Sequence, residues 1–351
     1  SHSACARKFA LATGSFGVHH RRKYQRFRSV KANLQDVAKV CGKDVSTVSR
    51  ALKNDSRISK KTTEAVQAAA RKLGYQPNLA ARMLKMGNSR IFWALVPTLG
   101  TIVDQRIADR ISLTAAGRDF DTAITVHHGR QEEFERLVAM ISSGLGAGVL
   151  INRRDIGDIS AVNQLIERGF PVVFVDVPVR RMEIGVVTTD NHRAASQLVR
   201  KVADEGVDCL VFGFRRDRNR VEERRFDGAI EGALASGKPY VFAHRENEWQ
   251  AAVRHQERLG LVCSGQNELF DLLGENAELL SGKKLIGGCF DVWNGGRTPF
   301  EEVWVAEQDY EKIADQALEH LLSLSKGGDP VPSQSLPLAA LRRVGAGNGK
   351  G

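Results

Sequence analysis

The chain has 351 residues, of which 42% are hydrophobic and 26% are charged, so it exceeds one ordinary domain and can bury substantial cores. No apolar run approaches the roughly 18–20 residues that span a bilayer, which argues against a membrane protein. The first fourteen residues hold an apolar stretch too short for the hydrophobic region of a secretion signal. The five cysteines lie far apart without a CxxC pair, which argues against a disulfide framework or a zinc site and fits a reducing cytoplasm.

The positive charge of the chain is concentrated at its N-terminal end. Residues 1–31 hold eight Lys/Arg and no Asp/Glu, and residues 32–90 hold twelve Lys/Arg and four Asp/Glu. The remaining 261 residues carry 31 basic and 37 acidic groups, within a formal net charge of +10 for the whole chain. A basic head on a mildly acidic body is expected of a protein that binds a polyanion with one end. A solvated basic tail without a partner is the alternative interpretation of the charge alone.

Residues 1–31 are predicted to be a disordered basic arm, because they show no sustained hydrophobic period. Tyr24 and Phe27 are interleaved with the basic residues, and such rings can stack on bases or pack on a neighbouring domain. A flexible arm without either contact is the simpler interpretation.

Residues 32–76 are predicted to form three short helices. Apolar side chains recur at helical spacing in residues 34–41, in residues 44–52 and in residues 59–73. Asp44 is placed to cap the second helix, because its carboxylate can accept hydrogen bonds from the first free amides. A tight break separates the first two helices, and three helices connected in this way describe a helix-turn-helix.

Residues 77–89 are predicted to be a hinge linker that contains one short helix. Pro77 breaks the chain, Asn78 can cap the helix, and Gly87 ends it. A helix this short is unstable alone in water, so it needs a partner against which to fold.

From residue 90 to residue 340 the pattern changes to strands that alternate with helices. Apolar runs typical of buried strands lie at residues 91–97, 122–128, 148–151, 171–176, 209–214, 240–243, 261–263 and 284–290. Helical stretches lie between them, for example at residues 131–143, 192–205, 224–235 and 310–324. This alternation predicts parallel sheets covered by helices, and the length fits two lobes. Residues 341–351 are predicted to be a flexible tail.

A resemblance to a known family begins at residue 33, in the segment NLQDVAKVCGKDVSTVSRALKNDSRISKKTTEAVQAAARKLGYQPNLAARMLK. Its pattern, LxDVAxxxGxxxSTVSRxLxN followed by LGYxPNxxAxxL, resembles the LacI/GalR family of transcription regulators. Later segments are similar to the family's core, namely TTDNHRAASQLV, RRFDGAIEGAL and IGGCFDVW. The resemblance extends over residues 33–340. It implies an all-α DNA-binding head joined to a two-lobed α/β core like that of type I periplasmic binding proteins.

The resemblance implies which side chains of the second helix contact DNA. A helix fits the major groove with its N-terminal residues at the base edges, and the matching residues are Val45, Ser46 and Arg50. Arg50 can donate a bidentate pair to guanine, worth about 1–3 kcal/mol of discrimination. Val45 either contacts a thymine methyl group or belongs to the core with Val48. Positions that match phosphate contacts are Thr47, Ser49, Ser59 and Thr62, of which Ser59 also suits a helix cap.

The resemblance also implies a role for the hinge linker. Family members insert a leucine from this helix into the minor groove, and the matching residue is Leu84. Such an apolar wedge unstacks a base step and kinks the duplex. Ala81 lies one turn earlier on the same face, and Tyr75 and Asn78 match neighbouring contacts. Two hinge helices side by side bury each other, which implies a homodimer, or a dimer of dimers, on a near-palindromic operator.

For the core, the resemblance implies a small-molecule effector in the cleft between the lobes, with a sugar or phosphosugar as the first candidate. The matching residues are Asp190, Arg225 and Asp291. An Arg–Asp pair suits a polyol, but Ser264-Gly265 and Val292 depart from the family pattern, so the effector and its existence stay open. The charged run at residues 215–225 is either a solvated, salt-bridged surface or a site for an anionic effector.

No enzyme signature accompanies these features, and no cofactor is expected. The glycine-rich residues 144–148 precede a strand instead of following one, and the chain has no GxSxG or HExxH motif. We therefore expect a cytoplasmic, nucleoid-associated repressor that binds operator DNA and responds to a small molecule. One alternative is a ligand-binding module of periplasmic type, which predicts a signal peptide and no basic head. The other is a nonspecific, architectural DNA binder without an effector.

Overall fold

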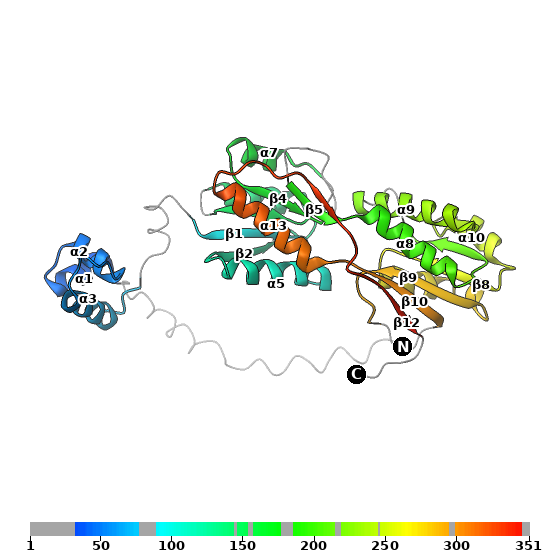
Figure 1. Cartoon of the computed structure of the whole chain (residues 1–351), viewed down its shortest axis with the longest axis horizontal. Helices are drawn as coiled ribbons and strands as arrows, with labels where there is room; N and C mark the ends of the chain where they lie inside the picture. Colours follow the sequence, from blue (N-terminus) through cyan, green and yellow to red (C-terminus); the bar gives the residue numbers. More distant parts are fainter. Residues whose placement is uncertain are drawn as a thin grey trace, which may run out of the picture. The chain divides into compact units, whose positions relative to one another are not determined.

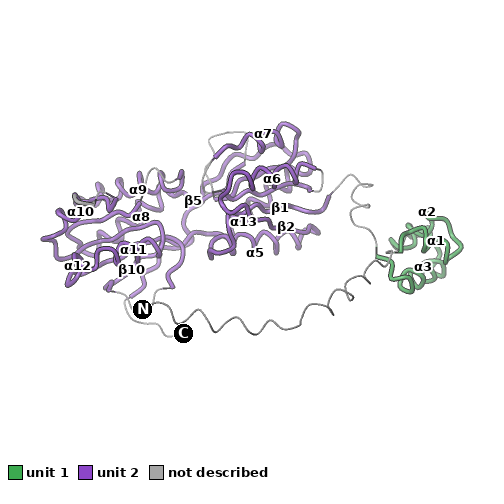
Figure 2. The backbone as a smooth tube through the Cα atoms, turned by 180° about the vertical axis from the view of Figure 1, so that it is seen from behind, with its two compact units in different colours: residues 1–87 green, residues 88–351 purple. Residues whose placement is uncertain are grey.

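The computed structural model describes residues 32–76, 89–143, 146–153, 157–176, 185–214, 219–244, 246–294 and 299–345. The chain divides into two compact units, residues 1–87 and residues 88–351 (Figure 2). Within the described ranges, no helix is both long and apolar enough to cross a membrane.

The described part of the first unit, here called the helical unit, consists of three helices (Figure 1). They are α1 (Leu34–Cys41), α2 (Val45–Leu52) and α3 (Lys60–Lys72). Their inner faces completely bury Val37, Val48, Ala51 and Val66. The periodic apolar positions therefore form one small core, and the predicted helix-turn-helix is confirmed.

Helices α1 and α2 are capped in different ways. Asn33 and Asp36 form a capping box, in which the Asn33 side chain accepts from the Asp36 amide at 3.1 Å and the Asp36 carboxylate accepts from the Asn33 amide at 2.9 Å. Gly42 ends α1 with φ at +57°, a conformation that other residues rarely adopt. The predicted cap by the Asp44 carboxylate is wrong, because this exposed side chain makes no capping hydrogen bond.

The second unit has two lobes, and lobe 1 is a sheet covered by helices on both faces. In the described residues the strand order is β11-β5-β4-β3-β1-β2, with all pairings parallel. The strands are β1 (Ile91–Val96), β2 (Asp121–Val126), β3 (Gly148–Ile151), β4 (Val172–Val175), β5 (Gly185–Thr189) and β11 (Gln334–Leu336). Helices α5 (Ile102–Ala116) and α13 (Tyr310–Ser325) bury one face, and α6 (Gln131–Ser142) and α7 (Ser160–Glu167) bury the other.

Lobe 2 repeats this architecture with one change at its edge. Its described strands have the order β12-β10-β9-β8-β6-β7, and β12 runs antiparallel to β10. The strands are β6 (Cys209–Phe212), β7 (Tyr240–Phe242), β8 (Arg258–Val262), β9 (Lys284–Phe290), β10 (Phe300–Glu307) and β12 (Ala340–Gly345). The helices are α8 (Asn191–Asp204) and α9 (Arg220–Ser236) on one face, and α10 (Glu246–Val253), α11 (Gln266–Glu275) and α12 (Ala277–Leu280) on the other. The predicted two α/β lobes with parallel sheets are therefore confirmed, and β12 is an antiparallel edge strand that the sequence did not predict.

The C-terminal residues correct a second expectation. Residues 341–345, predicted to belong to a flexible tail, form most of β12. Leu341 and Val344 pack against the two cores of lobe 2, and Arg342 donates to the Glu307 carboxylate at 2.6 Å. The prediction failed because β12 is held by a strand that is distant in sequence, and its own residues carry little hydrophobic signal. Residues 346–351, like the predicted arm at 1–31, lie outside the described residues.

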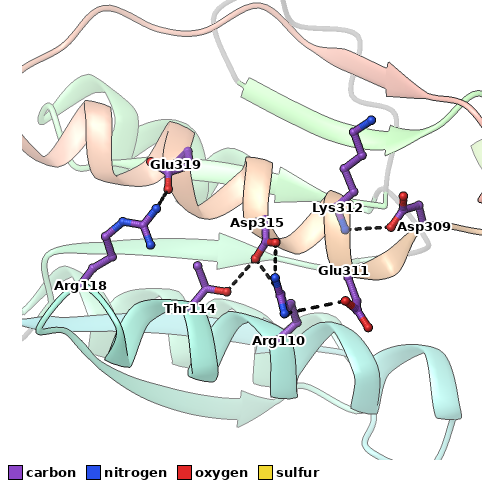
Figure 3. A network of polar contacts seen from close by, with 8 residues as sticks. All are labelled: Arg110, Thr114, Arg118, Asp309, Glu311, Lys312, Asp315 and Glu319. Atoms are coloured by element: carbon purple, nitrogen blue, oxygen red, sulfur yellow. Dashed lines mark hydrogen bonds and ion pairs between the residues drawn. The ribbon is translucent and has the colours of Figure 1, made fainter.

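Charged contacts join α13, from late in the chain, to α5, from the start of lobe 1 (Figure 3). Arg110 donates to both carboxylate oxygens of Asp315, at 2.8 and 2.6 Å, and Thr114 donates to the same carboxylate at 2.7 Å. One helical turn further along, Arg118 pairs with Glu319. These pairs fix the register in which α13 lies beside α5, while the buried side chains of both helices fill the core beneath.

The chain passes between the lobes after β5, after β10, and between β11 and β12. Each lobe therefore contains segments from before and after the other lobe in sequence. The carboxyl ends of parallel strands in α/β sheets are where ligand crevices form.

Candidate functional site

The exposed side of α2 carries the three predicted base-contacting residues. Val45 is 40% exposed, and Ser46 and Arg50 are also exposed, whereas Val48 and Ala51 are completely buried. Val45 therefore does not belong to the core, which was the alternative left open by the sequence. An apolar side chain, a hydroxyl and a guanidinium share the face of a short helix that its neighbours α1 and α3 leave uncovered.

The hydroxyl residues predicted to contact phosphate lie at helix ends and flanks. Ser59 caps α3 by accepting from the Thr62 amide at 3.3 Å, and the two side-chain hydroxyls lie 2.9 Å apart. Thr47 and Ser49 are half-buried on α2. Because a hydroxyl has one donor and two acceptor positions, the cap leaves hydrogen-bonding capacity at Ser59 and Thr62.

The remaining predicted DNA contacts lie at the end of the helical unit. Tyr75 is partly buried and packs against the helical core. Asn78, Ala81 and Leu84 lie outside the described residues, as does nearly all of the predicted hinge linker.

The helical unit is basic, with nine Lys/Arg and four Asp/Glu in residues 32–76. One of these acids is already paired, since Arg57 donates to Asp55 at 2.9 and 2.7 Å. The hydrogen bond to Arg57 holds the pKa of the Asp55 carboxyl well below its ordinary value. The Asp55 carboxyl is therefore ionised at neutral pH.

The two-lobed unit contains a cavity of about 770 Å³ between its lobes. Lobe 1 contributes Thr101, Gly129 and Asp176 to the lining, among other residues. Lobe 2 contributes Glu222, Arg225, Ser264, Phe290, Asp291 and Gln308. A cavity of this size accommodates a drug-sized molecule.

Arg225 is held rigidly at the wall of this cavity. It is only 5% exposed, and its Nε donates to Asn191 Oδ1 at 2.8 Å while a terminal nitrogen donates to the Ser264 carbonyl at 3.2 Å. The guanidinium carbon lies 3.8 Å from the centre of the Phe290 ring. These contacts fix the orientation of the guanidinium before any ligand arrives, so little conformational entropy remains to be lost on binding.

Asp291 lies in the same cavity but has its own partners. Its Oδ1 accepts from Gln308 Nε2 at 2.5 Å and from the Tyr310 hydroxyl. Burial raises the pKa of Tyr310 well above its ordinary value, so this hydroxyl remains a donor. Asp291 has φ at +77°, a strained conformation for a residue with a side chain. The predicted Arg–Asp pair therefore lines one cavity without forming a direct ion pair.

Asp190 has a different role from the one predicted. It is the N-cap of α8, where its side chain accepts from the Arg193 amide at 3.2 Å, and it does not line the cavity between the lobes. Its neighbour Asn191, which the sequence did not single out, contacts Arg225. A helix that starts at Asn191 makes the preceding aspartate the cap and turns the asparagine inward.

Asp176 is a cavity residue that sequence reasoning missed. It follows β4 directly, is 8% exposed, and has φ at +56°. Asp291 follows β9 in the same way. The available signal was an aspartate immediately after a buried strand, as in PVVFVD and IGGCFD, because strand carboxyl ends face the crevice in parallel sheets.

A buried polar network supports the lobe 1 side of the cavity. His127 Nδ1 accepts from the Gly129 amide at 3.1 Å, so Nε2 carries the proton and donates to the Asn152 carbonyl at 3.1 Å. The side-chain amide of Asn152 donates from Nδ2 to Asp104 Oδ1 at 3.1 Å, and the Thr101 hydroxyl donates to the other oxygen of this carboxylate at 2.5 Å. Thr101 and Gly129 both line the cavity, so the network fixes two of its wall segments.

The thiols of Cys263 and Cys289 in lobe 2 are protonated at neutral pH and therefore unreactive. Burial raises the pKa of the Cys289 thiol to about 12 and that of Cys263 higher still. In the part of the chain that the structure describes, no three His, Cys, Asp or Glu side chains lie close enough to hold a metal ion. The geometry of the cavity is that of a binding site made of one guanidinium, carboxylates, amides and an aromatic ring.

Residues 33–78 match the family model described as bacterial regulatory proteins, lacI family. The helical unit belongs to the lacI family. CytR, an HTH-type transcriptional repressor of Escherichia coli K12, is 29% identical to this chain over 185 residues, which are 51% of this chain and 53% of CytR. The chain spans about half the length of the curated relatives that it matches.

Solved structures of transcription regulators are similar in fold to about nine-tenths of this chain. A lac repressor dimer bound to operator and the anti-inducer ONPF has a TM-score of 0.73 at 18% identity, over 90% of this chain and 99% of that chain. The regulator CelR in complex with cellobiose has a TM-score of 0.61 at 18% identity, over 91% of this chain and 100% of that chain. The family model that matches residues 33–78 describes bacterial regulatory proteins.

Proposed function

We propose that the chain is a sequence-specific DNA-binding transcription regulator that acts as a repressor. The observation that carries the proposal is the exposed face of α2, where Val45, Ser46 and Arg50 lie on a basic lacI-family helical unit. In the major groove, Arg50 donates to guanine, Ser46 hydrogen-bonds a base edge, and Val45 contacts a thymine methyl group. Thr47, Ser49, Ser59 and Thr62 contact phosphates and fix the register. The site of action is the chromosome, in the cytoplasm.

The operator is near-palindromic and is bound by a homodimer, or by a dimer of dimers. The lac repressor of similar fold was solved as a dimer bound to operator, which supports this arrangement. Leu113 on α5 and Ile124 on the edge strand β2 are 63% and 40% exposed, and these two elements pack side by side. A second copy of this chain covers this apolar flank, because large apolar side chains on adjacent elements favour association.

The hinge linker at residues 77–89 folds against its copy in the partner when both lie on DNA. Leu84 enters the minor groove as a wedge, with Tyr75, Asn78 and Ala81 as neighbouring contacts. Replacing Leu84 with alanine therefore weakens operator binding and reduces DNA bending in a FRET assay on end-labelled duplexes. Unchanged bending would reject the wedge.

A small molecule in the cavity between the lobes sets operator affinity. The remaining terminal nitrogen of Arg225 and the second carboxylate oxygen of Asp291 offer a donor and an acceptor to ligand hydroxyl groups, which suits a sugar or a phosphosugar. The CelR–cellobiose complex and the Cra complex with fructose 1-phosphate, both of similar fold, support this ligand class. The ligand changes operator affinity by the difference between its affinities for two lobe arrangements, typically about 1–3 kcal/mol.

The deciding experiment is selection of binding sites from random duplex DNA with the full chain, with and without a panel of sugars and phosphosugars. We expect one enriched palindromic sequence whose recovery changes with one compound. An architectural DNA binder, the main alternative, would enrich no sequence. Absence of any enriched sequence at physiological salt would overturn the proposal.

A further inference from the structure

Asp44, the residue directly before α2, carries a carboxylate that does not cap its own helix. Its backbone has the extended conformation of an N-cap, with φ at −64° and ψ at 147°, and its side chain is exposed. The equivalent residues of α1 and α3, Asn33 and Ser59, both cap their helices through side-chain hydrogen bonds. Aspartate is among the residue types that cap helices best, yet Asp44 makes no such bond. Its carboxylate is therefore available to a donor from outside the chain.

The other acids of the helical unit are placed differently. Asp36 completes the capping box of α1, and Asp55 is held in an ion pair at 2.7 Å. Glu64 is exposed on α3. Asp44 is thus the acid at the N-terminal end of α2, next to the exposed Val45. The proposed function places this end of the helix at the base edges of the major groove.

A carboxylate in this place opposes binding to DNA unless it finds a hydrogen-bond donor there. Phosphate oxygens, purine N7, guanine O6 and thymine O4 are all acceptors, and they repel it. The donors that the major groove offers are exocyclic amino groups, N4 of cytosine and N6 of adenine. Adenine places the N7 acceptor beside its amino group, where it repels the second carboxylate oxygen, whereas cytosine has a C–H group beside N4. Cytosine is therefore the base whose edge suits Asp44 best.

We propose that Asp44 is a further specificity-determining residue, which accepts a hydrogen bond from the N4 amino group of a cytosine in each half of the operator. This inference rests on the proposed function, because it needs α2 in the major groove. Asp44 directly precedes Val45, so the cytosine lies at or beside the base pair that Val45 contacts. The carboxylate discriminates twice, since it gains a hydrogen bond at cytosine and is repelled by the acceptors of guanine and thymine.

Selection of binding sites from random duplex DNA by the full chain, by Asp44→Asn and by Asp44→Ser tests this inference. We expect the parent chain to enrich a cytosine at one position of each half-site. Asp44→Asn should replace this preference by adenine, because the asparagine side chain pairs with adenine N6 and N7. Asp44→Ser should leave the position without a preference, because a hydroxyl group both donates and accepts. The other positions of the selected sequence should not change in either variant.

Fluorescence anisotropy on the parent's selected operator and on random duplex measures the size of the effect. Asp44→Ser should lower the ratio of operator affinity to random-duplex affinity at least about fivefold. Its affinity for random duplex should rise, because a negative charge is removed from the neighbourhood of the phosphates. Glu64→Gln is the control, since it removes the same charge from the exposed surface of α3 and should leave the selected sequence unchanged. Both Asp44 variants should melt no lower than the parent, because asparagine and serine are good N-caps.

Two outcomes overturn this inference while the proposed function stands. In the first, the parent enriches a sequence and both Asp44 variants select the same one. In the second, the position that changes in the variants holds no cytosine in the parent's sequence, or changes equally in Glu64→Gln, so that charge and not a base contact is responsible. A parent chain that enriches no sequence overturns the proposed function, and this inference with it. The selection therefore separates the two failures.

Discussion

The helical unit and the two-lobed unit place their candidate functional residues in opposite ways. Arg50 lies on the surface of a helix whose inner face already completes a core, so that it has little part in folding the unit. Arg225 lies inside the wall of the cleft, where it hydrogen-bonds Asn191 and Ser264 and stacks on Phe290. Function and stability are therefore separable in the first unit and joined in the second. Substitutions that affect one property but not the other test this difference.

The largest effect is expected from Arg225→Met. The change removes two hydrogen bonds from a charged donor and leaves Asn191 Oδ1 unpaired, which should lower the free energy of unfolding by about 2–4 kcal/mol. Urea unfolding of the full chain, followed by tryptophan fluorescence, measures it. The exposed Arg193→Met on α8 is the control and should change stability by less than about 0.5 kcal/mol. Equal effects of the two changes on the free energy of unfolding would contradict the conclusion that Arg225 stabilises the two-lobed unit.

Arg50→Lys is expected to have the opposite profile. Lysine keeps the charge but loses the planar fork that pairs with guanine, so affinity for a selected operator should fall by about 1–3 kcal/mol. Affinity for random duplex and the melting temperature should not change. Fluorescence anisotropy on both DNAs measures this, with the exposed Arg71→Lys at the end of α3 as control. A parallel loss on random DNA would mean that Arg50 contacts only phosphate.

A smaller effect is expected where α13 meets α5 (Figure 3). Asp315→Asn breaks a bidentate pair whose two side chains are each 33% exposed, and it should cost about 0.5–1 kcal/mol. Glu319→Gln breaks a pair with exposures of 46% and 51%, and it should cost close to nothing. Neither change should alter ligand binding in the cleft. Urea midpoints at low and high salt measure both, and the Asp315 effect should shrink as salt rises.

The smallest effect concerns His320 on α13. Burial lowers the pKa of His320 below its ordinary value of 6.5, so the folded protein holds the neutral ring. As the pH falls below about 6.5, the unfolded chain takes up a proton that the folded chain resists, and the free energy of unfolding falls. His320→Leu should reduce this slope between about pH 6.5 and pH 5.5, with the parent chain as reference. An unchanged slope in urea titrations would contradict the assignment.

Much of the fold was predictable because its signals are local. The helices at residues 34–41, 44–52 and 59–73 were predictable from the spacing of their apolar residues. Asn33 begins α1 and Gly42 ends it through contacts within a few residues. By contrast, β10 was not predicted, since its sequence FEEVWVAE shows no continuous apolar run. β12 was taken for a flexible tail because only its pairing with β10 makes it a strand.

The candidate cleft was only partly predictable. Arg225 and Asp291 were identified and do line one cavity, although each has its own partners. Asp190 was identified for its resemblance, but the start of α8 makes it a cap and directs Asn191 to Arg225. Asp176 was missed because a single aspartate after a strand carries no spacing signal.

The sequence by itself determined the helical unit, its basic charge and the exposed side of α2, because helical periodicity and capping act over a few residues. Only the tertiary structure decided the cleft, because its walls come from segments more than one hundred residues apart. Such walls meet only after both sheets are assembled and the chain has passed between the lobes, and this geometry leaves no pattern in any short stretch of sequence.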